Sequence, residues 1–261
     1  MYPKLNCKKI DKKTGIRYPT KKEIASFANR LLNDYCKKFN KDIDAINYYE
    51  FVSKYLKIDI QYQKLSLDKS ILGATIQKDG QIVTYSYDGN VKIINVKKGD
   101  IFIDSDACGC EERELLTIFH EVKHYLEDLD KDFKVDKILD NRSIIDGKFP
   151  VHSEYAWAEY YANYFAICIL LPLRRLKKLY NEFHFEHLTK YRTNLNGSNI
   201  KYLRLIIKKI SDKTCASQSA IALRLKETRL ISEQTFARLD YKYGKEAVLL
   251  FRLNSKERKK K

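Results

Sequence analysis

The spacing of apolar residues changes twice along this chain, and the two changes determine which segments can form helices and which can form strands. Residues 21–39 carry apolar side chains every three or four positions, as on one face of a helix, with Thr20 placed as the N-cap. The spacing falls to two between residues 58 and 104, which is typical of strands, and the helical period returns from residue 111. These changes predict an α+β fold whose strands are confined to one segment.

Five short runs of β-branched and aromatic residues occupy the segment of period two. They are residues 58–62, 71–76, 81–86, 91–96 and 101–104. Turn dipeptides that adopt positive φ readily stand between them, namely Asp79-Gly80, Gly89-Asn90 and Gly99-Asp100. Because such turns join neighbouring strands as hairpins, we expect a small antiparallel sheet of four or five strands, packed on helices.

The predicted elements divide the chain into three parts. Residues 1–18 have mixed charge and no apolar period, so we expect a flexible arm. Residues 19–193 contain the strands and the longer helices and form the main domain. The run rich in Asn, Gly and Ser at residues 194–199 is typical of a linker, and residues 199–261 are expected to form a C-terminal helical unit with a basic tail. Further helices are predicted at residues 44–56, 111–128, 154–171, 200–210, 217–227 and 232–243.

His120 and His124 lie four positions apart within the predicted helix 111–128, so both imidazole rings lie on one helix face, one turn apart. Neutral imidazole is a common ligand of zinc, and Glu121 then stands beside the first ligand, where it can act on water as a general base. Two ligands do not hold zinc, so the pattern requires a third ligand from another element.

Three residues of the following segment are candidates for this third ligand: His152, Glu154 and Glu159. Glu159 is favoured because small residues such as Ala162 surround it, which lets its helix approach the histidine helix closely. Asn163 follows Glu159 by one turn and can accept a hydrogen bond from the free ring N–H of a ligating histidine. The sequence therefore predicts a metal site formed by the two histidines and Glu159, with Asn163 as an outer support.

Two segments together resemble the ImmA/IrrE family of metallopeptidases. Residues 116–126 read Leu-Thr-Ile-Phe-His-Glu-Val-Lys-His-Tyr-Leu, and residues 159–172 read Glu-Tyr-Tyr-Ala-Asn-Tyr-Phe-Ala-Ile-Cys-Ile-Leu-Leu-Pro. The family pattern is a His-Glu-x-x-His helix followed by Glu-x-x-Ala-Asn-x-Phe-Ala and an ending close to Leu-Leu-x-Pro. The resemblance also includes the order of elements from residue 21 to 172, and extends more weakly to residues 216–225.

This resemblance implies a zincin-like metallopeptidase domain followed by a C-terminal unit similar to a helix-turn-helix. It also implies that His120, His124 and Glu159 bind Zn²⁺, or another divalent ion such as Mn²⁺, with Glu121 as general base. Members of the family are cytoplasmic endopeptidases that cut helix-turn-helix transcriptional repressors, which makes such a repressor the expected partner. Lys123 departs from the family pattern, which usually has a small residue at this position, and it places a long cation near the metal site.

A peptidase also needs a surface for the substrate and a donor for the developing oxyanion. Residues 101–104, the last strand before the histidine helix, are expected to form the sheet edge to which an extended substrate adds. His152, Tyr155, Tyr160 and Tyr161 are equally placed in the sequence as oxyanion donors.

The formal net charge of +16, from 50 Lys and Arg against 34 Asp and Glu, favours acidic partners and raises two alternatives. One is a DNA-binding regulator with a structural or vestigial metal site, in which a helix after residue 217 presents Arg224, Lys226 and Arg229 to duplex DNA. The other is a SprT-like protease that acts on DNA-bound proteins and uses His152 as the third ligand. In the favoured interpretation, any DNA contact through the basic surface is weak or indirect.

No stretch of the sequence approaches the roughly 18 apolar residues of a membrane span, and the first residues lack the apolar run of a secretory signal. We therefore expect a cytoplasmic protein with no membrane partner.

Overall fold

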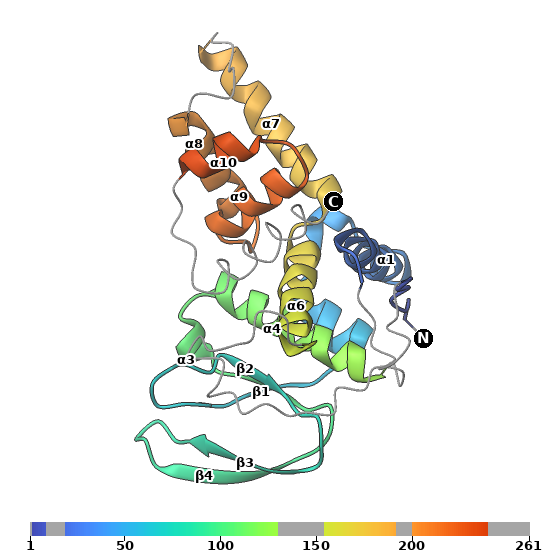
Figure 1. The fold of residues 1–261 in the computed structure, drawn as a ribbon, viewed down its shortest axis with the longest axis vertical. Helices are drawn as coiled ribbons and strands as arrows, with labels where there is room; N and C mark the ends of the chain where they lie inside the picture. Colours follow the sequence, from blue (N-terminus) through green and yellow to red (C-terminus); the bar gives the residue numbers. More distant parts are fainter. Residues whose placement is uncertain (1, 9–18, 130–153, 192–199, 240–261) are drawn as a thin grey trace. The chain divides into compact units, whose positions relative to one another are not determined.

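The computed structural model describes residues 2–8, 19–129, 154–191 and 200–239 (Figure 1). Its contacts divide the chain into two compact units, Met1–Ile169 and Leu170–Lys261. The first unit combines helices with strands, and the second is helical in its described residues, so the predicted α+β class is confirmed. The predicted linker at residues 194–199 lies outside the described residues, and the division between the units falls before it.

The first helix, α1 (Lys21–Phe39), begins and ends where the sequence predicts. The Thr20 hydroxyl accepts a hydrogen bond from the Glu23 N–H, and the Glu23 carboxylate accepts one from the Thr20 N–H at 2.7 Å, which completes a capping box. The helix ends at Asn40, whose φ of 50° lies in the left-handed region. Its apolar face, including Ile24 and Leu31, is fully buried.

The predicted second helix is divided into three short turns. They are η1 (Ile43–Ala45), α2 (Tyr48–Glu50) and the π-helical segment η2 (Phe51–Leu56). The Asn47 side chain accepts a hydrogen bond from the Glu50 N–H and therefore starts a new helix inside the predicted one.

All five predicted strands are present: β1 (Ile60–Tyr62), β2 (Gly73–Thr75), β3 (Gly80–Tyr85), β4 (Val91–Val96) and β5 (Ile101–Ile103). The prediction of a single antiparallel sheet is wrong. β3 and β4 form a separate hairpin, while a three-stranded sheet has the order β1-β5-β2, with β5 parallel to β1 and antiparallel to β2. The turn at Gly89 makes the hairpin, whereas the turn at Gly99 leads the chain out of it. Turn residues specify pairing between neighbours, and the β1–β5 pair is joined only through a long connection.

β5 is the middle strand of its sheet, and Ile101, Phe102 and Ile103 are all buried. The prediction that residues 101–104 form an open edge for substrate is therefore wrong, because consecutive buried side chains belong to a strand covered on both faces. In the part of the chain that the structure describes, β2 has a strand neighbour on one side only. β2 also packs along helix α4 (Glu111–Leu129).

The hairpin packs one face on the rest of the unit and exposes the other. Ile82 and Ile94, which pair across the hairpin, lie against a buried cluster of Leu65, Ile76, Val96 and Phe102. On the opposite face the paired residues Val83 and Ile93 are 50% and 65% exposed.

Aromatic contacts connect the helices of the first unit. The ring of Phe27 on α1 lies 5.5 Å from that of Phe165 on α6 (Glu154–Leu170). The ring of Phe51 in η2 lies 5.9 Å from that of Phe119 on α4. These contacts fix α4 and α6 in the same core, which is what allows side chains from both helices to meet.

The second unit consists, in its described residues, of α7 (Leu173–Tyr191), α8 (Ile200–Asp212), α9 (Gln218–Glu227) and α10 (Glu233–Leu239). The last three match predicted helices, and Ser217 caps α9 by accepting a hydrogen bond from the Ala220 N–H. No helix was predicted from the sequence at α7. The Tyr202 hydroxyl on α8 donates to the Phe183 carbonyl on α7 at 3.0 Å and joins these two helices.

Residues 2–8 of the predicted arm contain no helix or strand. Their first member, Tyr2, donates a hydrogen bond from its hydroxyl to the Leu56 carbonyl, so this end of the segment contacts the folded unit. Residues 9–18 lie outside the described part.

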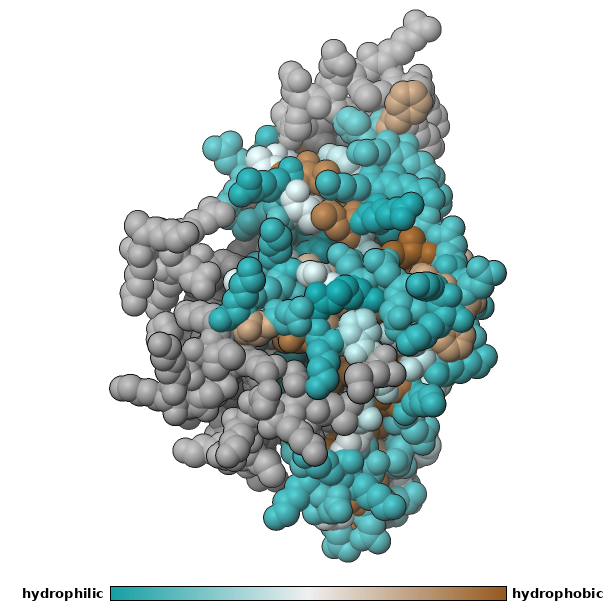
Figure 2. Space-filling model, turned by 90° about the vertical axis from the view of Figure 1, so that its right-hand side faces the viewer, coloured by the Kyte–Doolittle hydropathy of each residue, from teal (hydrophilic) through white to brown (hydrophobic). Residues whose placement is uncertain are grey.

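Hydrophilic side chains cover most of the described surface in the view of Figure 2, with smaller hydrophobic areas between them. Among the described helices, none combines the length and the hydropathy that crossing a bilayer requires.

Candidate metal centre

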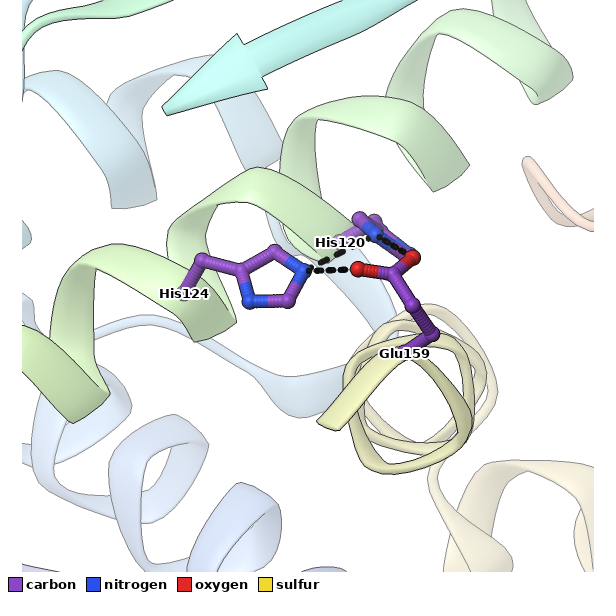
Figure 3. A group of neighbouring side chains, drawn as sticks. All are labelled: His120, His124 and Glu159. Carbon is purple, nitrogen blue, oxygen red and sulfur yellow. Dashed lines mark hydrogen bonds and ion pairs between the residues drawn. The ribbon is translucent and has the colours of Figure 1, made fainter. Parts of the chain in front are cut away.

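Three side chains from two helices converge on one point (Figure 3). His120 and His124 extend from successive turns of α4, and their Nε2 atoms lie 3.0 Å apart. Glu159 reaches toward them from α6: its Oε2 lies 3.0 Å from His120 Nε2, and its Oε1 lies 3.2 Å from His124 Nε2. The structure thus brings together the three residues that the sequence predicts as ligands, and they form a group that can hold a metal ion.

The spacing of these donor atoms fits a small divalent cation. A tetrahedral ion with bonds of about 2.0–2.1 Å separates its ligand atoms by about 3.3 Å. The separations of 3.0, 3.0 and 3.2 Å between the two imidazole nitrogens and the carboxylate oxygens are close to this value. The three side chains are 15–25% exposed, so the group is also accessible from outside.

Asn163 supports the group from one turn further along α6. Its Oδ1 lies 3.1 Å from His120 Nδ1, and its Nδ2 donates to the Glu159 carbonyl at 3.0 Å. The second bond orients the amide so that Oδ1 faces the ring and accepts a hydrogen bond from the Nδ1–H group. When the ring is neutral, this tautomer leaves the lone pair on His120 Nε2, the atom that faces Glu159 and that a metal ion would take. Ala158 and Ala162 on α6 are buried and allow the close approach that the sequence predicts.

The Glu159 carboxylate and the two histidines shift one another's pKa values. Burial raises the pKa of Glu159, but the neighbouring His120 and His124 lower it more strongly, so that it lies well below its usual value. Burial lowers the pKa of His120, while the Glu159 carboxylate raises it, with a net pKa of about 9. Without a metal ion, the pair therefore holds a proton at neutral pH, and a metal ion has to displace that proton.

Glu121 lies beside the ligands and is 8% exposed. The Thr75 hydroxyl on β2 is 2.7 Å from Glu121 Oε2 and 3.0 Å from the Glu121 carbonyl oxygen. Thr75 is not among the site residues predicted from the sequence. Its only signal in the sequence is that it is a polar residue inside a predicted strand, and this does not indicate which residue it contacts.

Lys123 is completely buried and pairs with Glu127 one helical turn further along α4. The long cation that the sequence places near the metal site is therefore compensated by Glu127 inside the protein.

Only some of the other predicted ligands and oxyanion donors lie in the described part of the chain. His152 lies outside the described residues, as do the side chains of Glu154 and Tyr155. Tyr160 and Tyr161 are buried, and their rings lie 5.5 Å apart.

The basic residues assigned to a DNA-reading helix have different surroundings. Arg224 is 4% exposed and lies within α9. Lys226 pairs with Glu233 at 2.7 Å, and Arg229 lies beyond the end of the helix, with a φ of 60°. α9 therefore does not present these three side chains together on an exposed face.

No protein-family model matches this chain, and no curated protein matches it. The resemblance to the ImmA/IrrE family therefore rests on the sequence features given above.

Proposed function

We propose that this protein is a zinc-dependent endopeptidase that cuts a partner protein. The observation that carries the proposal is the convergence of His120, His124 and Glu159 with Glu121 beside them. Two imidazoles and one carboxylate are the ligand set of many zinc peptidases, which keep a further position for water.

A bound zinc ion supplies a Lewis acid that polarises the scissile carbonyl and makes water more acidic. Glu121 takes the proton of the attacking water on its carboxylate and passes it to the leaving amine. Asn163 keeps His120 in the tautomer that leaves Nε2 unprotonated. Burial of Glu121 keeps this proton transfer away from bulk water.

The open side of β2 is the surface that we assign to the substrate, in place of β5. An extended segment can add to such a strand by main-chain hydrogen bonds. β2 packs along α4, so a segment bound there lies next to the helix that carries Glu121. By resemblance to the ImmA/IrrE family, we propose a helix-turn-helix repressor as the substrate.

The two alternatives have less support. In a SprT-like arrangement His152 replaces Glu159 as third ligand, yet Glu159 already lies 3.0 and 3.2 Å from the two histidines. A DNA-binding regulator requires exposed basic side chains on α9, and Arg224 is buried there.

The proposal is tested with the full chain, stripped of metal by a chelator and reloaded with one equivalent of Zn²⁺. We expect cleavage of helix-turn-helix repressors, or of a peptide library, as new termini detected by mass spectrometry. Glu121→Gln should retain zinc and lose cleavage by about 100-fold or more, since it removes the general base. Glu182→Gln, on the exposed surface of α7, is the matched control. Absence of cleavage by the zinc-loaded chain, or equal cleavage by Glu121→Gln, contradicts the proposal.

A further inference from the structure

One residue of β2 contacts Glu121 through its side chain and faces the open edge of the sheet through its main chain. The Thr75 hydroxyl lies 2.7 Å from Glu121 Oε2. It also lies 3.0 Å from the Glu121 carbonyl oxygen, so it contacts both the side chain and the main chain of the same residue. Within the described residues, Thr75 is the hydrogen-bond partner of this carboxylate, which leaves Oε1 to receive a proton.

The main-chain N–H and C=O groups of Thr75 point away from β5, whereas those of the adjacent residues point toward it. The Leu72 carbonyl accepts from the Asp104 N–H, and the Ile76 N–H donates to the Asp100 carbonyl, both at 2.9 Å. Peptide groups alternate in direction along a strand, so the even-numbered residues of β2 bond to β5. The N–H and C=O groups of Gly73 and Thr75 therefore point to the open edge, where an added strand bonds.

The close packing of β2 on α4 keeps Thr75 within reach of Glu121. A Cβ atom on Gly73 would lie 2.8 Å from Thr117 Cγ2, closer than real Cβ contacts, and 3.0 Å from Glu121 Cγ, which is tighter than most of them. Glycine therefore permits this close approach, because a side chain here would force Thr117 or the strand itself to shift.

We infer that Thr75 is a positioning residue that holds the Glu121 carboxylate in place for proton transfer, on the same strand that binds the substrate. This inference rests on the proposed function. Without the hydroxyl, Oε2 loses its partner in a mostly buried position, and the carboxylate turns toward other donors or water. The ligands of the metal ion do not depend on this hydrogen bond.

The test uses acetohydroxamate, a small bidentate metal ligand whose O–H proton must pass to a nearby base when it binds. The chain is loaded with Co²⁺, whose visible spectrum reports both metal binding and acetohydroxamate binding. Thr75→Val keeps the branched shape and removes the hydroxyl, while Thr75→Ser keeps the hydroxyl. Thr84→Val is the matched control, because Thr84 is a strand threonine whose buried hydroxyl has no hydrogen-bond partner among the described residues.

We expect Thr75→Val to bind acetohydroxamate about tenfold more weakly, the order of a hydrogen bond to a charged group. Thr75→Ser and Thr84→Val should remain within about twofold of the wild type, by the same reasoning. All variants should bind Co²⁺ equally. In a cleavage assay, Thr75→Val should lower kcat and leave KM unchanged, since the main-chain bonds of β2 remain.

The outcomes separate this inference from the proposed function. If Glu121→Gln weakens acetohydroxamate binding and Thr75→Val does not, or if Thr75→Ser is as weak as Thr75→Val, the role of Thr75 is refuted and the peptidase proposal stands. If Glu121→Gln also binds the probe normally, or if the chain binds no Co²⁺, both are overturned. Should Thr75→Val fail to fold, Thr75→Ser decides: tight binding supports the role of the hydroxyl, and weak binding refutes it.

Discussion

Thr75 and Thr84 lie in two regions of the first unit that differ in whether their buried polar side chains are hydrogen-bonded. Around α4, α6 and β2, the Thr75 hydroxyl bonds to Glu121, and Asn163 connects His120 to the backbone of Glu159. In the hairpin β3–β4, Thr84 is fully buried and its hydroxyl has no partner in the described part of the chain. The contrast indicates that the polar side chains near α4 hold one another in position through hydrogen bonds. In the hairpin, by comparison, the buried Thr84 hydroxyl makes no stabilising hydrogen bond.

The largest expected effect comes from removing the carboxylate that joins the two helices. Glu159→Gln keeps the shape of the side chain but removes the negative charge between two imidazoles. We expect a loss of zinc affinity greater than the roughly 10- to 100-fold that follows removal of an outer partner. Competition with a chromogenic chelator measures it, with Glu182→Gln as control. Unchanged affinity would mean that Glu159 is not a ligand.

A smaller loss is expected when the outer support is removed. Asn163→Ala leaves the three donor atoms in place but frees the His120 ring to change tautomer and orientation. Zinc affinity should fall by about 10- to 100-fold. Asn181→Ala, on the exposed part of α7, is the matched control. Equal affinities for the two variants would show that the Asn163 contact does not support the site.

The shifted pKa of His120 predicts how zinc binding depends on pH. Since this pKa is raised from 6.5 to about 9 by the Glu159 carboxylate, the metal-free site holds a proton below about pH 9. Zinc binding at pH 7 should therefore release about one proton from His120, and affinity should fall about tenfold per pH unit as the pH decreases below 9. Calorimetry in buffers of different ionisation enthalpy counts the protons. Proton release that is the same in Glu159→Gln would contradict the assigned cause.

The same shifts make a linked prediction for the metal-free protein. Because the pKa of His120 is raised on folding, protonated His120 stabilises the folded state. This contribution is fully present below pH 6.5, the ordinary pKa, and is lost as the pH rises through about 9. The lowered pKa of Glu159 contributes stability above its ordinary 4.5, which is lost as the pH falls further. Unfolding by urea at several pH values should show both losses, and both should be absent in Glu159→Gln.

The smallest effect is expected in the hairpin, and it has the opposite sign. Thr84→Val removes a buried hydroxyl that has no partner, so the free energy of unfolding should rise by about 1 kcal/mol. Zinc affinity should not change. Urea unfolding of the zinc-free protein measures the difference. A clear destabilisation would show that the hydroxyl is bonded in solution and would remove the contrast between the two regions.

Those parts of the fold that depend on local spacing could be predicted from the sequence. The capping box of Thr20 and Glu23 lies within four residues, and so does the pair His120 and His124. The meeting of these histidines with Glu159 could be predicted because small residues such as Ala162 flank Glu159 and let its helix approach the histidine helix.

Features that depend on distant contacts could not be predicted. The pairing of β5 with β1 and β2 joins strands far apart in the chain, and no turn residue specifies it. Thr75 acquires its role only because β2 lies on α4. The burial of Lys123 likewise depends on its surroundings, since sequence alone favours an exposed lysine.

The helix α7 was not predicted, although the apolar spacing of a helix is present in its sequence. Leu176, Leu179 and Phe183 follow the helical period and are buried.

The central claim is that two side chains of α4 and one of α6 hold a single metal ion. An anomalous difference map at the zinc edge, from crystals grown with one equivalent of zinc, tests it most directly. The account predicts one peak per chain, about 2.0–2.1 Å from His120 Nε2, His124 Nε2 and a Glu159 oxygen. A peak bound by His152 instead of Glu159, or no peak between α4 and α6, would contradict it.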